Sequence, residues 1–195
     1  MKDTFTHKPI MAYRRNRNLG DILGQKTIIN NKVLRKDRSH TIGSYNPCSS
    51  GNGCKCCRHV RQTTTFKSYR TNKRYNIFHK LNCRSKLVLY LMECTICRLQ
   101  YVGKSEWAMN IRINKHRNDV HRTDGLECDK HFQNTGHDFD KHAKFTIIEE
   151  LKDKSKSPLA MRKLLEQRED AWIIKLRTLR PDGFNKELND PTLPY

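Results

Sequence analysis

The apolar residues of this chain gather in two short runs near its middle. Residues 87–92 and residues 99–102 each predict a buried strand, and a C-x-x-C turn joins the two. Each run carries one tyrosine, Tyr90 in the first and Tyr101 in the second. The segment KFTIIEEL at residues 144–151 predicts a third strand.

Helical patterns lie between and after these strands. Ser105 is placed to cap a helix over residues 106–120, whose apolar face repeats at i, i+4 and i+7. A shorter helix ends at Gly136, and a Ser-Pro pair at residues 157–158 starts a long helix that runs to about residue 178. This order predicts an α+β domain, with a small three-stranded antiparallel sheet flanked by helices.

The composition divides the chain into three segments. Residues 1–45 are basic with little periodicity, and we expect a partly disordered arm. Residues 46–84 start with a turn-rich, Cys-rich knuckle (PCSSGNGCKCCRH) without regular elements and continue into a small hairpin (TTTFKSYRTNKRYNIF). Residues 85–190 carry the predicted sheet and helices.

The formal net charge of +19 over 195 residues favours a polyanionic partner, and nucleic acid is the first expectation. An anionic membrane is the alternative. The sequence has neither a long basic amphipathic helix nor an apolar run of about 18 residues, so we expect no membrane partner. The basic residues of the arm are either solvated or lie along DNA phosphates; they are Arg14, Arg15, Arg17, Arg35, Lys36 and Arg38.

The chain contains eight cysteines and no signal-type start. This combination favours metal ligation or free thiols in a reducing, intracellular compartment over a disulfide framework. Seven of the eight lie between Cys48 and Cys97, and Cys128 stands apart. Clustering of this kind is typical of zinc ligation.

A carboxylate interrupts the apolar face of the long C-terminal helix. Leu165, Trp172 and Leu176 form one apolar stripe, and Glu169 falls inside it. A buried carboxylate is costly unless it is paired or binds a cation. Two interpretations remain, a salt bridge to an arginine and a metal-binding carboxylate that holds Mg²⁺ together with water and phosphate.

The helix predicted over residues 106–120 carries two further candidates. His116 lies within its buried face, and Arg112 borders that face one turn earlier. A core-facing histidine is commonly a hydrogen-bonded structural residue. Beside two tyrosines, however, an Arg and a His one turn apart also make a phosphate clamp, because Arg offers phosphate two parallel donors.

Taken together, these motifs resemble the GIY-YIG nuclease family. VLY at residues 88–90 and YVG at residues 101–103 are similar to its paired signature, with ten residues between the two tyrosines. Val88 replaces the first glycine of that signature, which a strand backbone tolerates. Arg112 and His116 match the Arg and His of the family's helix motif. Glu169 matches its metal-binding glutamate, and Asn185 matches the asparagine near the end of the domain.

Further segments narrow the resemblance to the endonuclease region of Penelope-like retroelements. They are the C-x-x-C between the tyrosine motifs, REDAWI, LRTLRPDGFN, the upstream cysteines and NCRSKLVLYL. KPIMAYRRNRNLGDIL is similar to the connector that precedes this region. The resemblance covers nearly the whole chain.

The resemblance implies hydrolysis of DNA phosphodiester bonds. Glu169 would hold one Mg²⁺ or Mn²⁺ that stabilises the leaving 3′ oxygen. Either Tyr90 or Tyr101 would position or deprotonate the attacking water. A tyrosine is a poor base unless cations lower its pKa, and Lys104 and Arg112 are the nearby candidates.

Other implied roles concern the phosphate and the biological setting. Arg112 and His116 would bind the scissile phosphate, and Asn185 would orient a neighbour or a water. In a retroelement the nick would leave a 3′-OH that primes reverse transcription. The expected partners are then DNA, element RNA and a reverse transcriptase domain, in the nucleus.

The resemblance places both tyrosines on adjacent strands that face one active site, with the C-x-x-C as the turn between them. Cys94 and Cys97 need two more ligands for zinc, and His131 and His137 supply them at suitable spacing. Such a Zn²⁺ would fix the hairpin and the direction of both tyrosines. Turn cysteines without metal are the alternative.

A second zinc site is expected just before the first strand, from Cys48, Cys54, Cys57 and Cys83. Cys56 is a competing ligand, His59 is an alternative to Cys83, and Cys128 has no obvious partner. Two other function classes remain. A zinc-stabilised, non-catalytic nucleic-acid-binding module explains the charge and the cysteines, and a zinc-stapled interaction protein leaves the charge unexplained.

Overall fold

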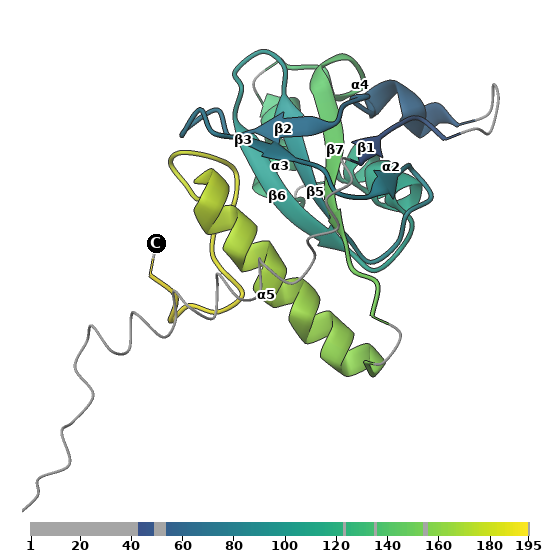
Figure 1. Cartoon of the computed structure of the whole chain (residues 1–195). Coiled ribbons are helices and arrows are strands. Elements are labelled where there is room, and N and C mark those ends of the chain that lie inside the picture. Colours follow the sequence, from purple (N-terminus) through teal and green to yellow (C-terminus); the bar gives the residue numbers. More distant parts are fainter. Residues whose placement is uncertain (1–42, 49–53, 123, 135, 154–155, 195) are drawn as a thin grey trace, which may run out of the picture. The chain divides into compact units, whose positions relative to one another are not determined.

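The centre of the structure is a three-stranded antiparallel sheet in the order β6-β5-β7 (Figure 1). Its strands are β5 (Val88–Cys94), β6 (Gln100–Ser105) and β7 (Ala143–Glu150). Each of these strands overlaps one of the three segments that were predicted as strands from the sequence. Helices lie around this sheet, so the described part of the chain has the α+β architecture that the element order predicted.

The computed structural model of the chain describes residues 43–48, 54–122, 124–134, 136–153 and 156–194. All of these residues belong to one compact unit. None of the helices among them is long and apolar enough to cross a membrane. The arm residues expected to contact DNA lie outside the described residues; they are Arg14, Arg15, Arg17, Arg35, Lys36 and Arg38.

The segment before the sheet contains two short strand pairs. The predicted hairpin is confirmed, because β2 (Thr65–Lys67) pairs antiparallel with β3 (Arg74–Asn76). β1 (Ser44–Tyr45) pairs in parallel with β4 (Lys80–Leu81), which no local pattern predicted. The expectation that the knuckle lacks regular elements is wrong at Lys55–His59, which forms the 3₁₀-helix η2. Such helices are a single tight turn and leave no periodic signal.

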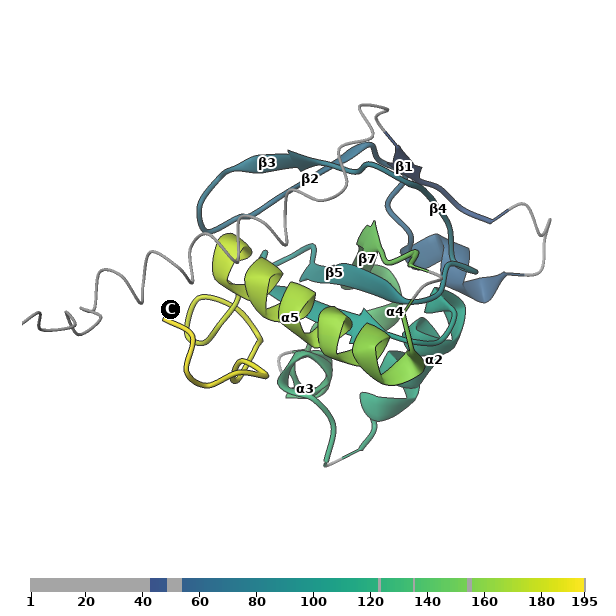
Figure 2. The ribbon, with the colours of Figure 1, turned by 60° about the horizontal axis from the view of Figure 1, so that its bottom comes forward.

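β5 is buried along its whole length because both faces of the sheet are covered. On one face, the ring of Tyr90 packs 5.7 Å from the ring of His116. On the other face, Leu91 and Phe66 of β2 line one hollow. Figure 2 accordingly shows the sheet between the β2–β3 hairpin and helices α2 and α3. A strand without a water-facing side gives a continuous apolar run, as VLYLM does.

Helix α2 (Met109–Asp119) follows β6 and presents the predicted buried face. Met109, Ile113, His116 and Val120 are all buried. The predicted start at Ser105 is wrong, because Ser105 still belongs to β6 and its Oγ donates to the Trp107 carbonyl. The helix therefore begins four residues after the expected cap, at Met109.

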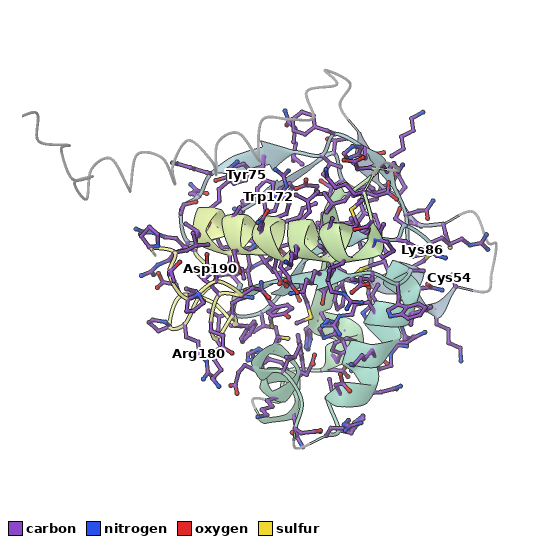
Figure 3. All side chains as sticks on the ribbon, turned by 90° about the horizontal axis from the view of Figure 1, so that it is seen from below. Cys54, Tyr75, Lys86, Trp172, Arg180 and Asp190 are labelled. Carbon is purple, nitrogen blue, oxygen red and sulfur yellow. The ribbon has the colours of Figure 1, made fainter. Side chains whose placement is uncertain are left out.

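Two short helices, α3 (Glu127–Asn134) and α4 (Phe139–His142), connect α2 to β7. The long helix α5 (Pro158–Leu176) begins where the Ser-Pro pair predicted, and Ser157 Oγ accepts a hydrogen bond from the Ala160 amide at 3.3 Å. Trp172 of this helix packs against the rings of the hairpin, and Figure 3 shows it beside Tyr75. Helix α5 thereby brings Glu169 to the sheet.

Candidate active site and metal centres

Tyr90 lies at the centre of a buried chain of hydrogen-bonded side chains. Arg112 Nε donates to Tyr90 Oη at 2.7 Å, and His116 Nε2 lies 2.7 Å from the same oxygen. Both partners come from one face of α2, as their spacing predicted. The hydroxyl oxygen accepts the hydrogen bond from Arg112, and its own proton remains available for a hydrogen bond to His116 Nε2.

Asp129 of α3 completes this chain on the other side of the imidazole. His116 Nδ1 lies 2.7 Å from Asp129 Oδ1, and both side chains are fully buried. The carboxylate holds the proton on Nδ1, which leaves Nε2 as the acceptor for Tyr90. Burial lowers the pKa of His116, and the hydrogen bond to Asp129 opposes this shift, so the net effect favours the neutral imidazole.

Sequence reasoning missed Asp129. The segment ECDKHFQN is rich in polar residues, and its histidine drew attention as a zinc ligand. One signal was present, because Asp129 precedes Phe132 by three residues and therefore shares its face of the helix. Both side chains are buried.

The environment of the tyrosines favours their neutral form. Burial raises the pKa of Tyr90, and the charge and hydrogen bond of Arg112 only partly oppose it. Burial likewise raises the pKa of Tyr101. Arg112 lowers the pKa of both tyrosines, as expected, but burial outweighs it and the net shift is upward. Lys104 is not among the causes of these shifts, and its Nζ bonds to Glu169.

Gly103 lets the two tyrosines share one face of the hairpin. Tyr90 pairs with Gly103 across the β5–β6 ladder, and the rings of Tyr90 and Tyr101 are 6.2 Å apart. A Cβ on Gly103 would lie 2.5 Å from Tyr90 Oη and 2.7 Å from the Tyr101 ring. Glycine at this position therefore makes room for the Tyr90 ring.

Asn185 does not reach a tyrosine or Glu169 through any hydrogen bond of its own. Its Oδ1 accepts from the Val102 amide at 2.9 Å, and its Nδ2 donates to the Val102 carbonyl at 2.8 Å. The buried amide thus holds the backbone of β6 directly after Tyr101.

Glu169 is buried on the apolar stripe of α5, as predicted, and its counter-ion is a lysine. Lys104 Nζ lies 2.6 Å from Glu169 Oε2, and the Asn189 amide donates to the same oxygen at 2.8 Å. Asn189 also accepts from Lys104 at 2.6 Å. Sequence reasoning missed Asn189, which lies in the loop after α5.

These groups meet at a groove of about 950 Å³. We call it the Glu169 groove; Tyr101, Lys104, Glu169, Asn185 and Asn189 line it. Tyr101 is half-buried, whereas Tyr90 is fully buried. Tyr101 is therefore the tyrosine that a molecule in this groove reaches first.

The β5–β6 hairpin, α3 and the loop after α3 bring together the first predicted group of metal ligands, which we call the hairpin cluster. Cys94 Sγ lies 3.3 Å from His137 Nδ1, and Cys97 Sγ lies 3.4 Å from His131 Nε2. All four ligand atoms lie within 4.8 Å of one another. Two thiols and two imidazoles at this spacing fit a tetrahedral metal ion such as zinc.

The second predicted group also converges, and we call it the knuckle cluster. Its members are Cys48, Cys54, Cys57 and Cys83, with their sulfur atoms within 4.8 Å of one another. The turn of η2 helps to form it, because the Cys57 amide donates to the Cys54 carbonyl. In Figure 3, Cys54 lies at the opposite end of α5 from Asp190, so this cluster is remote from the loop that carries Asn189.

Three other candidate ligands lie outside both clusters. Cys56 Sγ contacts the Asn110 carbonyl and the Asn114 side chain. His59 Nδ1 contacts the Ala143 carbonyl at 3.1 Å. Cys128 is buried, and its Sγ lies 3.7 Å from Asp129 Oδ1. The geometry thus resolves the alternatives that spacing left open for the knuckle cluster.

The sequence matches no family model and no curated protein, and the structure matches no solved structure.

Proposed function

We propose that this chain is a metal-dependent DNA endonuclease of the GIY-YIG type, which nicks DNA by hydrolysing a phosphodiester bond. The observation that carries the proposal is the convergence of Tyr90, Tyr101, Arg112, His116 and Glu169 on one side of the β5–β6 hairpin. These residues come from four separate elements, β5, β6, α2 and α5, and the net charge of +19 supports a nucleic-acid substrate.

The donor set around Glu169 fits one divalent cation. A single carboxylate at the wall of a groove leaves room for the waters and phosphate oxygens that Mg²⁺ or Mn²⁺ prefers. Lys104 neutralises Glu169 in this structure and would move aside when a divalent cation takes its place. When bound, the cation would supply Lewis-acid stabilisation of the leaving 3′ oxygen.

The protein side chains would divide the remaining work. Arg112 uses its Nε on Tyr90, and its terminal nitrogens would bind a phosphate. Tyr101, at the surface of the groove, would orient the attacking water by a hydrogen bond. Tyr90, His116 and Asp129 would hold Arg112 in place. The water oxygen would form the new bond to phosphorus and release one proton to solvent, while the bond to the 3′ oxygen breaks and that oxygen takes up a proton from solvent.

Zinc would have a structural role in this proposal. A Zn²⁺ in the hairpin cluster would tie the β5–β6 turn to α3, which carries both His131 and Asp129. The direction of Tyr101 and the position of Asp129 would then depend on one metal. A second Zn²⁺ in the knuckle cluster would fix the segment that leads into β5 through Cys83.

The test is nicking of supercoiled plasmid with Mg²⁺ or Mn²⁺ by the parent chain, Glu169→Ala, Arg112→Ala and Glu166→Ala. We expect the first two variants to bind DNA and lose at least about 100-fold in nicking rate. Glu166→Ala is the matched control, because Glu166 is only half-buried on the same helix. Equal nicking by the parent and Glu169→Ala would contradict the proposal.

The second candidate function is a zinc-stabilised nucleic-acid-binding module without catalysis. One observation favours it, namely that the ammonium of Lys104 already satisfies Glu169. A parent protein that contains zinc, binds DNA and never nicks would support this module. The proposed retroelement setting, with a nick that primes reverse transcription in the nucleus and with element RNA and a reverse transcriptase as partners, applies only to the nuclease.

A further inference from the structure

Trp107 has the largest exposed fraction of any large apolar side chain among the described residues, at 69%. Ile111, four residues further on, is 53% exposed. Both line a second groove of about 580 Å³, which we call the Trp107 groove. Large apolar side chains that remain exposed and share one hollow mark a contact surface.

The loop that carries Trp107 is held in place on both sides. Ser105 Oγ donates to the Trp107 carbonyl at 2.9 Å. The neighbouring Glu106 accepts two hydrogen bonds from Arg162 of α5, at 2.9 and 3.2 Å. The indole is therefore presented by a braced loop, which lowers the entropy cost of binding a partner.

The charge around the indole selects the kind of partner. Lys104, Arg112 and Lys115 line the same groove. The single acidic residue in its lining, Glu106, is paired with Arg162. An aromatic plane surrounded by cations matches a nucleic-acid strand, in which flat bases alternate with phosphates. It suits a purely apolar peptide poorly, because such a peptide offers no anionic group to the cations of this groove.

The Trp107 groove continues into the candidate active site. Lys104 lines both grooves, and Arg112 lines the Trp107 groove while it bonds to Tyr90. A strand whose phosphate lies against Arg112 therefore has its neighbouring nucleotide within the groove that carries Trp107. A base in a continuous duplex has no free face, so only a base that has left the stack can pack on the indole.

Resting on the proposed function, we propose that Trp107 stacks on an unpaired base of single-stranded DNA beside the phosphate that Arg112 binds. Lys104 and Lys115 hold the flanking phosphates, and Ile111 contacts the edge of the stacked base. The preferred substrate is then DNA with unpaired nucleotides at the cut, such as a gap or a single-stranded flank.

Tryptophan fluorescence measures this contact directly. The chain has two tryptophans, and Trp172 is only 8% exposed. Titration of the full chain with an oligothymidine of about ten nucleotides should quench the emission of Trp107. Trp107→Phe should still bind and should lose most of the quenching. Binding without quenching in the parent overturns the proposal, as does equal quenching in Trp107→Phe.

Affinities give a second and independent readout. Trp107→Ala should weaken oligothymidine binding by about 5- to 100-fold, and Trp107→Phe by less because a phenyl ring still stacks. Binding of a blunt duplex should change little. Leu159→Ala is the matched control, since Leu159 is an apolar side chain with 63% exposure outside this groove. Equal losses in the Leu159 and Trp107 variants overturn the proposal.

The plasmid assay separates this inference from the nuclease proposal. Quenching without nicking would support the stacking site and contradict the nuclease proposal. Nicking without quenching would contradict only the proposed stacking site. Failure of the parent to bind oligothymidine at all overturns the stacking site, whatever the plasmid shows.

Discussion

At the scale of single residues, Asn185 shows how one buried amide fixes a strand. Its two hydrogen bonds to Val102 join the loop after α5 to the backbone of β6. Asn185→Ala leaves the Val102 amide and carbonyl without these partners in a buried site. We expect a loss of about 2 to 3 kcal/mol in the free energy of unfolding, measured by urea denaturation.

Asn189→Ala is the matched control for this prediction. Asn189 is exposed and bonds to the side chains of Lys104, Glu169 and Asp170, and it makes none of the hydrogen bonds to the backbone of β6 that Asn185 makes. We expect it to cost less than 1 kcal/mol, as surface substitutions do. Equal losses in the two variants would contradict the role assigned to Asn185.

His116 should make the stability depend on pH. Burial lowers its pKa in the folded state below the usual value of 6.5. The unfolded chain therefore binds more protons between the two pKa values, so stability falls as the pH drops below about 6.5. The slope from this residue is at most about 1.4 kcal/mol per pH unit.

His116→Gln should remove this part of the slope when urea unfolding is followed from about pH 7.5 to pH 5.5. The comparison is made with His121→Gln, which changes an exposed histidine just beyond the end of α2. The expected result is a shallower slope for the His116 variant and an unchanged slope for the His121 variant. Parallel slopes in all three proteins would mean that His116 takes up its proton alike in both states.

At the scale of elements, the hairpin cluster joins the β5–β6 turn to α3. Cys97→Ser should lower the zinc content by one ion per chain, because the turn loses a thiolate ligand. The strand pair should then exchange its amide hydrogens faster, as measured by hydrogen exchange. Amides of the β2–β3 hairpin, which does not carry these ligands, provide the internal reference.

Cys56→Ser is the matched control for the zinc measurement. Cys56 lies next to a knuckle ligand in sequence, and its sulfur contacts Asn110 and Asn114 outside both clusters. We expect its zinc content to equal that of the parent. Loss of zinc from Cys56→Ser but not from Cys97→Ser would mean that the ligand sets are assigned wrongly.

The sequence allowed the elements to be predicted where one local cause determines them. The strands followed from continuous apolar runs, and α5 followed from its Ser-Pro start. The parallel pairing of β1 with β4, by contrast, joins segments 36 residues apart (Ser44 with Lys80), and no short pattern encodes it. Asp129 and Asn189 were missed for the same reason, because each bonds to a residue of another element. The partner of Asp129 is His116, and that of Asn189 is Lys104.

At the scale of the whole molecule, the two grooves and the excess positive charge should act together on one DNA strand. Lys104 belongs to both grooves, so a bound strand would pass from Trp107 toward Glu169. Phosphate contacts release counter-ions, whereas stacking on an indole does not. The salt dependence of the binding affinity therefore distinguishes phosphate contacts from stacking.

The affinity of the full chain for oligothymidine should fall steeply with salt, with a slope of log K against log salt of about −0.7 per phosphate contact. Lys115→Ala should reduce this slope by about 0.7, because one cation leaves the Trp107 groove. Trp107→Ala should lower the affinity at every salt concentration and leave the slope unchanged. A flat dependence in the parent, or equal slope changes in both variants, would mean that the charge and the indole do not serve one bound strand.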